Sequence, residues 1–88
     1  MADEPVVTVY GTTWCPDCWR AKKVLEAQRV DYVWINIDED AAAADRVKAL
    51  NGGMRSVPTI VFPNGKMVVE PSNAALLQAV LAWRQRLP

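Results

Sequence analysis

The chain has 88 residues, of which 51% are hydrophobic and 23% charged, so it has the size of one small domain and no room for a second. Its ten basic and ten acidic residues cancel, which argues against nucleic acid or an anionic membrane surface as a partner. No apolar run approaches the ~20 residues of a membrane-spanning helix. Residues 1–5 carry two acidic side chains where a secretory signal would carry basic ones, and no apolar segment of the kind found in such signals follows them. We therefore expect the protein to lie in the reducing cytosol. We also expect it to be a monomer.

The first part of the chain is predicted to form a β-α-β unit. Val6–Tyr10 is a short β-branched and aromatic run followed by glycine, which is typical of a buried strand. Within Pro16–Gln28, apolar residues recur at three- and four-residue spacing and predict an amphipathic helix. Asp31–Ile37 is again rich in β-branched and aromatic side chains. It predicts a second strand at crossover distance from the first.

A second helix and a hairpin are predicted next. Asp38 and Asp40 are both candidates to cap an alanine-rich helix at Ala41–Leu50, because acidic side chains accept hydrogen bonds from free N–H groups at a helix start. Thr59–Phe62 and Met67–Val69 are β-rich and flank an Asn-Gly pair. That pattern predicts two antiparallel strands joined by a tight turn.

The last predicted element is a helix at Asn73–Arg86, capped by Ser72. No repeat or linker interrupts the series. Residues 1–88 are therefore expected to form a single α/β domain of order βαβαββα, with a mixed four-stranded sheet flanked by three helices. In such sheets, chemistry gathers where strands end and helices begin.

The chain has only two cysteines, and both lie where the first strand gives way to the first helix. With Pro16 at the first helical position, Cys15 is expected to be the N-cap residue. Its sulfur would then lie among free N–H groups at the positive end of the helix dipole, which favours thiolate over thiol. Cys18, one turn deeper, should be less exposed and less acidic. It should also be close enough to attack a mixed disulfide formed on Cys15.

Besides a redox role, such a pair could form a structural disulfide or contribute to a metal site. A structural disulfide across two residues closes too small a loop to stabilise the fold much, and a cytosolic thiol pool would tend to reduce it. A zinc site needs four ligands, usually Cys or His, and the chain has two cysteines and no histidine. A metal or an iron–sulfur cluster would therefore need a second chain or a foreign thiol. Cys-x-x-Cys beside a β-α-β pattern favours a redox pair.

The motif Trp14–Cys18, together with Ser56-Val57-Pro58 before a strand and an Asn-Gly hairpin, resembles the glutaredoxin branch of the thioredoxin superfamily. It is most similar to small redoxins of the mycoredoxin type, and the likeness covers residues 6–85. The resemblance implies a thioredoxin-like (glutaredoxin) fold. It also implies that Pro58 is a cis proline packed against the active-site disulfide, and that Val57 presents its backbone to a substrate cysteine or small thiol.

The residues predicted to contact a substrate surround these two motifs. They are Trp14, Pro16, Asp17, Arg55, Val57, Pro58, Ser72 and Asn73. Ser72 and Asn73 offer helix-terminal N–H groups to a ligand carboxylate. Asp17 stands where glutaredoxins commonly have an aromatic residue. It could oppose thiolate formation or simply suit a helix N-terminus, and both alternatives stay open.

The combined prediction is a thiol-disulfide oxidoreductase in which Cys15 attacks an oxidised substrate and Cys18 resolves the mixed disulfide. We expect no tightly bound cofactor and no metal. The expected partners are oxidised proteins and a low-molecular-weight thiol such as mycothiol or glutathione, with no nucleic acid and no membrane. One alternative is a redoxin reduced by a thioredoxin-reductase-type flavoenzyme, for example one that serves ribonucleotide reductase. Another, from a different class, is an iron–sulfur or metal-binding scaffold.

Overall fold

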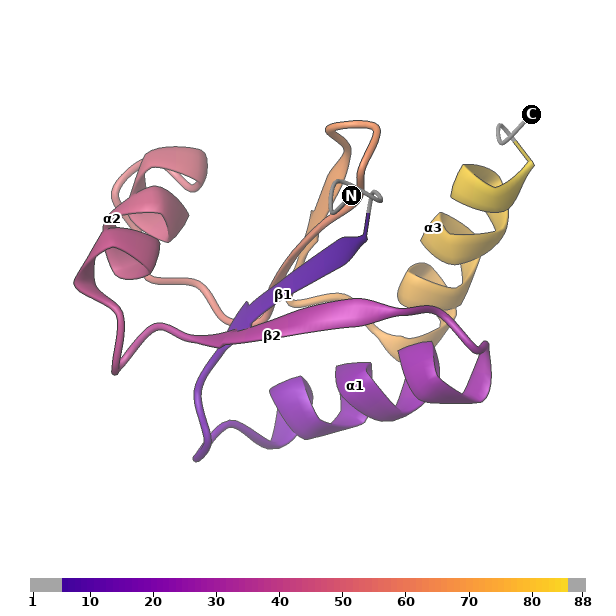
Figure 1. The fold of residues 1–88 in the computed structure, drawn as a ribbon, viewed down its shortest axis with the longest axis horizontal. Coiled ribbons are helices and arrows are strands. Elements are labelled where there is room, and N and C mark those ends of the chain that lie inside the picture. Colours follow the sequence, from indigo (N-terminus) through magenta and orange to yellow (C-terminus); the bar gives the residue numbers. More distant parts are fainter. Residues whose placement is uncertain (1–5, 86–88) are drawn as a thin grey trace.

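A computed structural model describes residues 6–85 and contains four strands and three helices (Figure 1). The strands are β1 (Val7–Gly11), β2 (Tyr32–Asn36), β3 (Thr59–Val61) and β4 (Met67–Val69). The helices are α1 (Pro16–Ala27), α2 (Ala41–Leu50) and α3 (Asn73–Arg84). Every predicted element is present, in the predicted order. The predicted helix end at Arg86 and the acidic residues 1–5 lie outside the described residues.

The four strands form one mixed sheet in the order β2-β1-β3-β4. β1 and β2 are parallel, with Gly11 opposite Asn36, because α1 carries the chain back across the sheet between them. β3 runs antiparallel to β1, and β4 antiparallel to β3. The predicted mixed sheet is thus confirmed, with the first strand in its interior.

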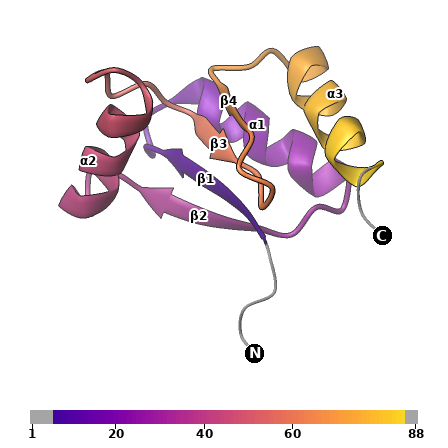
Figure 2. The ribbon, with the colours of Figure 1, turned by 90° about the horizontal axis from the view of Figure 1, so that it is seen from above.

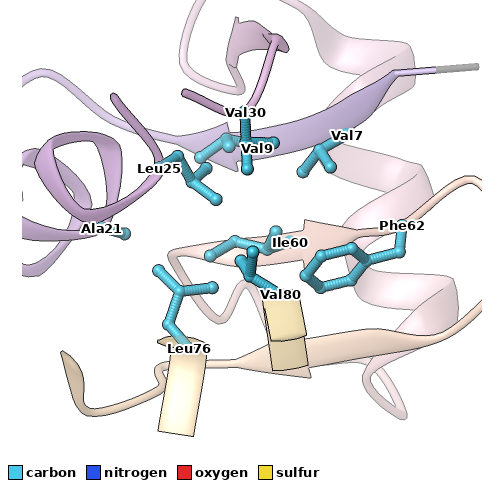
Figure 3. Packing of buried hydrophobic residues seen from close by; sticks show 9 residues of the cluster. All are labelled: Val7, Val9, Ala21, Leu25, Val30, Ile60, Phe62, Leu76 and Val80. Atoms are coloured by element: carbon cyan, nitrogen blue, oxygen red, sulfur yellow. The ribbon is translucent and has the colours of Figure 1, made fainter. Parts of the chain in front are cut away.

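The side chains of the sheet alternate between two apolar clusters. Val7 and Val9 of β1 belong to the larger cluster, together with residues of α1 and α3, whereas Tyr10 belongs to a smaller one formed with α2. The larger cluster consists of Val7, Val9, Ala21, Leu25, Val30, Ile60, Phe62, Leu76 and Val80 (Figure 3). Figure 2 shows α1 and α3 side by side, with α2 apart from them. The sheet is therefore covered by helices on both faces.

This packing fixes the beginning of α1 at the end of the sheet where β1 ends. Ala21 and Leu25 of α1 are buried against β1 and β3. Full burial of a leucine side chain contributes about 1.5–3 kcal/mol to folding. These contacts therefore hold α1 in place just after its first turn. Cys15 and Cys18 lie at this end of the helix. Within residues 6–85, none of the helices has both the length and the apolar character that crossing a membrane requires.

Candidate active site

Cys15 caps the N-terminus of α1 with its sulfur. Its backbone is extended (φ −94°, ψ 111°), and the Cys18 backbone N–H donates to Cys15 Sγ at 3.1 Å. Pro16 occupies the start of the helix, where its missing N–H leaves no hydrogen bond unmade. Both thiols are free in this structure. The predicted N-cap is therefore confirmed, with sulfur in the place of a capping oxygen.

Cys18 is the more deeply buried of the two cysteines. It has no exposed surface, compared with 6% for Cys15. Burial, followed by the neighbouring Cys15 side chain, raises the pKa of Cys18 to about 12, while a hydrogen bond from the backbone of Thr12 acts in the opposite direction. Cys18 is thus a protonated thiol at neutral pH in the reduced protein. This agrees with the expectation that it is the less exposed of the pair.

Gly11 makes room for Cys18 at the end of β1. A Cβ atom at this position would lie 2.7 Å from Cys18 Sγ and 2.6 Å from Cη2 of Trp34. Such distances are far inside van der Waals contact, so only glycine fits without displacing its neighbours. From the sequence, Gly11 is expected only to end a strand. A glycine immediately after a β-rich run was the only available signal of this close approach.

The segment before β3 carries the second motif. The Val57–Pro58 peptide bond is cis, as the resemblance implied, and Pro58 is buried while Val57 is half-buried. Two hydrogen bonds hold the segment: Thr59 Oγ1 donates to the Ser56 carbonyl at 2.7 Å, and the Glu70 N–H donates to the Pro58 carbonyl at 2.9 Å. The segment is therefore fixed on β3 and on the residues that follow β4.

Asp38 has a different role from the one predicted. Asp40, and not Asp38, caps α2, since Asp40 Oδ1 accepts from the Ala43 N–H at 3.0 Å. Asp38 instead accepts from Trp14 Nε1 at 2.9 Å and from Arg55 Nη2 at 2.7 Å. These hydrogen bonds lower the pKa of Asp38, and the one from Trp14 has the larger effect. The carboxylate of Asp38 therefore connects Trp14, the residue before Cys15, to Arg55, in the segment before Pro58.

A pocket of about 130 Å³ lies at this junction. Its lining residues are Thr12, Trp14, Ile37, Arg55 and Val57. Three of the residues predicted to contact substrate thus meet here, while Pro16 begins the adjacent helix. Thr12 and Ile37 complete the lining and are not among the residues predicted to contact substrate. For Thr12 the sequence indicated only a hydroxyl near the cysteine motif, and for Ile37 it gave no signal.

Ser72 and Asn73 do not line this pocket. Ser72 caps α3, because its Oγ accepts from the Ala75 N–H at 3.0 Å. Asp17 lies in the first turn of α1, with Oδ1 3.0 Å from Arg20 Nη2. Its charge is also among the causes that raise the pKa of Cys18. The structure therefore gives Asp17 both a position that suits a helix N-terminus and an effect on the buried thiol.

No group of three or more Cys, His, Asp or Glu side chains within residues 6–85 is placed to hold a metal ion.

A second pocket, of about 190 Å³, lies between the β3–β4 hairpin and α3 and is lined by neither cysteine. Neither cysteine lines the smaller pocket, but Trp14, which precedes Cys15 in the chain, does, so this pocket lies next to the start of α1.

The geometry of this site agrees with a comparison to known families. The family model of glutaredoxins matches residues 7–68. The chain belongs to the glutaredoxin family. A Cys-x-x-Cys pair at a helix start, with a cis proline just before β3, is thus found in a chain whose family is established by its sequence. The glutaredoxin fold and thiol-disulfide oxidoreductase activity predicted from the sequence are confirmed.

Relatives of this glutaredoxin are found among bacteria and archaea. A protein of Mycobacterium tuberculosis named as a glutaredoxin is 42% identical over 66 residues, which cover 75% of this chain and 79% of that protein. Mycoredoxin 1 of Corynebacterium glutamicum is 37% identical over 76 residues, which cover 86% of this chain and 94% of that protein. The crystal structure of a glutaredoxin from Archaeoglobus fulgidus superposes with a TM-score of 0.75 at 28% identity, covering 89% of this chain and 88% of that one.

Proposed function

We propose that this glutaredoxin reduces protein disulfides, or mixed disulfides between proteins and small thiols, through a two-cysteine cycle. In this proposal it acts as a cytosolic monomer and uses a low-molecular-weight thiol, such as mycothiol or glutathione, as its co-substrate. The observation that carries the proposal is the position of Cys15 Sγ as the N-cap of α1, 3.1 Å from the Cys18 backbone N–H. A negative charge on sulfur is stabilised there by the N–H groups and the helix dipole.

In the first step, the Cys15 thiolate attacks one sulfur of the substrate disulfide. A bond forms between Cys15 Sγ and that sulfur, and the second substrate sulfur leaves as a thiolate that takes up a proton. Cys15 is the suitable attacker because it retains some exposed surface, whereas Cys18 has none. Val57 and Pro58 lie in the segment just before β3, where the backbone of an incoming chain can pair with them.

In the second step, Cys18 attacks Cys15 Sγ and releases the remaining substrate thiol. The protein is left with a Cys15–Cys18 disulfide, having given up two electrons. The Cys15 side chain is one of the causes that keep the pKa of Cys18 high in the reduced protein. Once Cys15 is bonded to substrate, that contribution is lost, while the hydrogen bond from the Thr12 backbone remains. Cys18 is therefore easier to ionise when its thiolate is needed.

The choice of a small thiol as co-substrate is supported by the relatives, which include a mycoredoxin and glutaredoxins. It is also supported by the pocket of about 130 Å³ that lies beside Trp14 and Val57. Such a pocket can hold part of a small thiol while its sulfur is bonded to Cys15.

The test is mass spectrometry of a Cys18→Ser variant recovered from its own host, since this variant cannot resolve the mixed disulfide. We expect an adduct on Cys15 whose mass identifies mycothiol, glutathione, another small thiol or a protein. The matched control is Cys15→Ser, which should carry no adduct on Cys18. An adduct on Cys18 of the control would contradict the assigned roles. Oxidised parent protein that is reduced only by a flavoenzyme, and by none of the small thiols, would contradict the proposed co-substrate.

A further inference from the structure

The pocket beside Cys15 contains one charged lining residue, and that charge is already balanced. Arg55 is the only one of the five lining residues with a charged side chain. Its Nη2 lies 2.7 Å from Asp38 Oδ1, and the other carboxylate oxygen of Asp38 accepts from Trp14 Nε1 at 2.9 Å. An unpaired arginine is a strong binder of carboxylates, because its N–H groups match their two oxygens. Here Asp38 already occupies the place that a substrate carboxylate would take.

The pocket also has a buried polar group that is not hydrogen-bonded. Thr12 is one of the lining residues and is 1% exposed. Its Oγ1 has no hydrogen-bond partner among residues 6–85. Buried polar atoms in native proteins are nearly always paired, and leaving one unpaired destabilises the fold. A hydroxyl group can both donate and accept, so it can pair with an uncharged polar group of a ligand.

We propose that this pocket selects substrates that carry an uncharged hydrogen-bonding group, such as a hydroxyl, next to the disulfide that Cys15 attacks. Asp38 is the residue that sets this preference, because it balances Arg55 and repels an incoming carboxylate. Thr12 supplies the hydrogen bond to the uncharged group. The inference rests on the proposed function and adds to it the chemical class of the group bound beside the reacting sulfur.

The test uses four small symmetric disulfides that differ in charge and polarity: hydroxyethyl disulfide, diethyl disulfide, dithiodipropionate and cystamine. Reduced full-length protein takes each disulfide to two thiols, with two electrons, and becomes the Cys15–Cys18 disulfide. The rate of loss of protein thiols is measured by stopped flow. Each rate is divided by the rate for a free cysteine peptide, which removes the intrinsic reactivity of the disulfide.

For the parent protein we expect the highest normalised rate with hydroxyethyl disulfide and no advantage for dithiodipropionate. In Asp38→Asn, the rate for dithiodipropionate relative to hydroxyethyl disulfide should rise by about fivefold or more, as expected for one unbalanced charge at contact distance. Glu39→Gln is the matched control, because it removes the neighbouring carboxylate, which forms no ion pair with Arg55 among residues 6–85. It should leave the ratio unchanged. An unchanged ratio in Asp38→Asn overturns the proposal.

The role of Thr12 is tested with a variant of the same shape. Thr12→Val should remove the preference for hydroxyethyl disulfide over diethyl disulfide, and Thr12→Ser, which keeps the hydroxyl, should retain it. An unchanged preference in Thr12→Val overturns the proposal. A measurement on the parent alone gives an independent check. If added salt lowers the normalised rate for dithiodipropionate, Arg55 is not balanced and the proposal is wrong. Failure of all four disulfides to react faster than with the free peptide would instead contradict the proposed function.

Discussion

The first two helices begin with the same hydrogen bond made by different atoms. At α2, Asp40 Oδ1 accepts from the N–H three residues later, at 3.0 Å. At α1, Cys15 Sγ accepts from the N–H three residues later, at 3.1 Å. Asp is among the preferred N-cap residues, and Cys is not. The comparison shows that α2 begins with a residue suited to stability, whereas α1 begins with a residue suited to reaction with a disulfide.

The two capping residues also differ in their exposure to solvent and in what lies next to them. Asp40 is exposed, and its side-chain hydrogen bond is the cap itself. Cys15 is buried, and the residue before it, Trp14, lines a pocket together with Arg55. The packing of α1 against β1 and β3 therefore compensates for a weaker cap. Variants at these two positions should separate stability from activity.

The largest expected effect is that of Cys15→Ser. Serine is a preferred N-cap, so this variant should stay folded and be at least as stable as the reduced parent. It should nevertheless lose all disulfide reduction, because the attacking sulfur is gone. Turnover of hydroxyethyl disulfide and urea unfolding under reducing conditions measure the two properties. Turnover equal to that of the parent would show that Cys15 is not the nucleophile.

Gly11→Ala should have the next largest effect. The new Cβ would meet Cys18 Sγ and Trp34 at under 3 Å. Overpacking of this kind typically costs about 1–3 kcal/mol, and displacement of Cys18 should also slow resolution of the mixed disulfide. Chemical unfolding and single-turnover kinetics check the two effects. Adding Trp34→Phe, which removes the clashing ring atoms, should recover part of the lost stability. No recovery would mean that the clash with Trp34 is unimportant.

Asp40→Ala is the counterpart of Cys15→Ser at the second helix. It should lower the free energy of unfolding by about 1 kcal/mol, because the Ala43 N–H loses its partner. Turnover per folded molecule should not change, since Asp40 does not line the pocket beside Cys15. Urea denaturation and a turnover assay check this. A large loss of turnover without a loss of stability would remove the contrast between the two helix starts.

Asp17→Asn should have the smallest effect, and it concerns pH. The pKa of Cys18 is raised to about 12 mainly by burial, and the negative charge of Asp17 is the weakest of the contributing causes. Removing that charge lowers the pKa, so more Cys18 is thiolate at any pH below it. Resolution of the mixed disulfide should become about two- to threefold faster at neutral pH, which is the effect expected from removing one partly screened surface charge. Slower resolution in rapid-quench measurements would contradict the conclusion that Asp17 raises the pKa of Cys18.

The sequence alone predicted the parts of this molecule that local patterns determine. Hydrophobic spacing, β-branched and aromatic runs, capping residues and the Asn-Gly turn together predicted all seven elements. The order Cys-Pro at the start of a helix was enough to place Cys15 at its N-cap, because proline at the first helical position leaves few other choices. The resemblance to glutaredoxins supplied the cis bond at Pro58, which no local pattern required.

The parts that could not be predicted depend on contacts between distant segments. Asp38 and Asp40 are equally good N-cap candidates in the sequence. Only the fold brings Trp14 and Arg55 to Asp38, across 24 and 17 residues of chain. Gly11 is likewise explained by a side chain from β2 that reaches it across the sheet. Such long-range contacts leave no periodic signal in a single sequence.

The relative reactivity of the two thiols tests the account most directly. Reduced protein is treated with iodoacetamide at neutral pH, and the labelled cysteine is identified by peptide mass spectrometry. We predict that Cys15 takes up essentially all the label while the protein is folded, and that Cys18 reacts only after unfolding in urea. Equal labelling of both thiols in the folded protein, or labelling of Cys18 first, would contradict the assignment of Cys15 as the attacking sulfur.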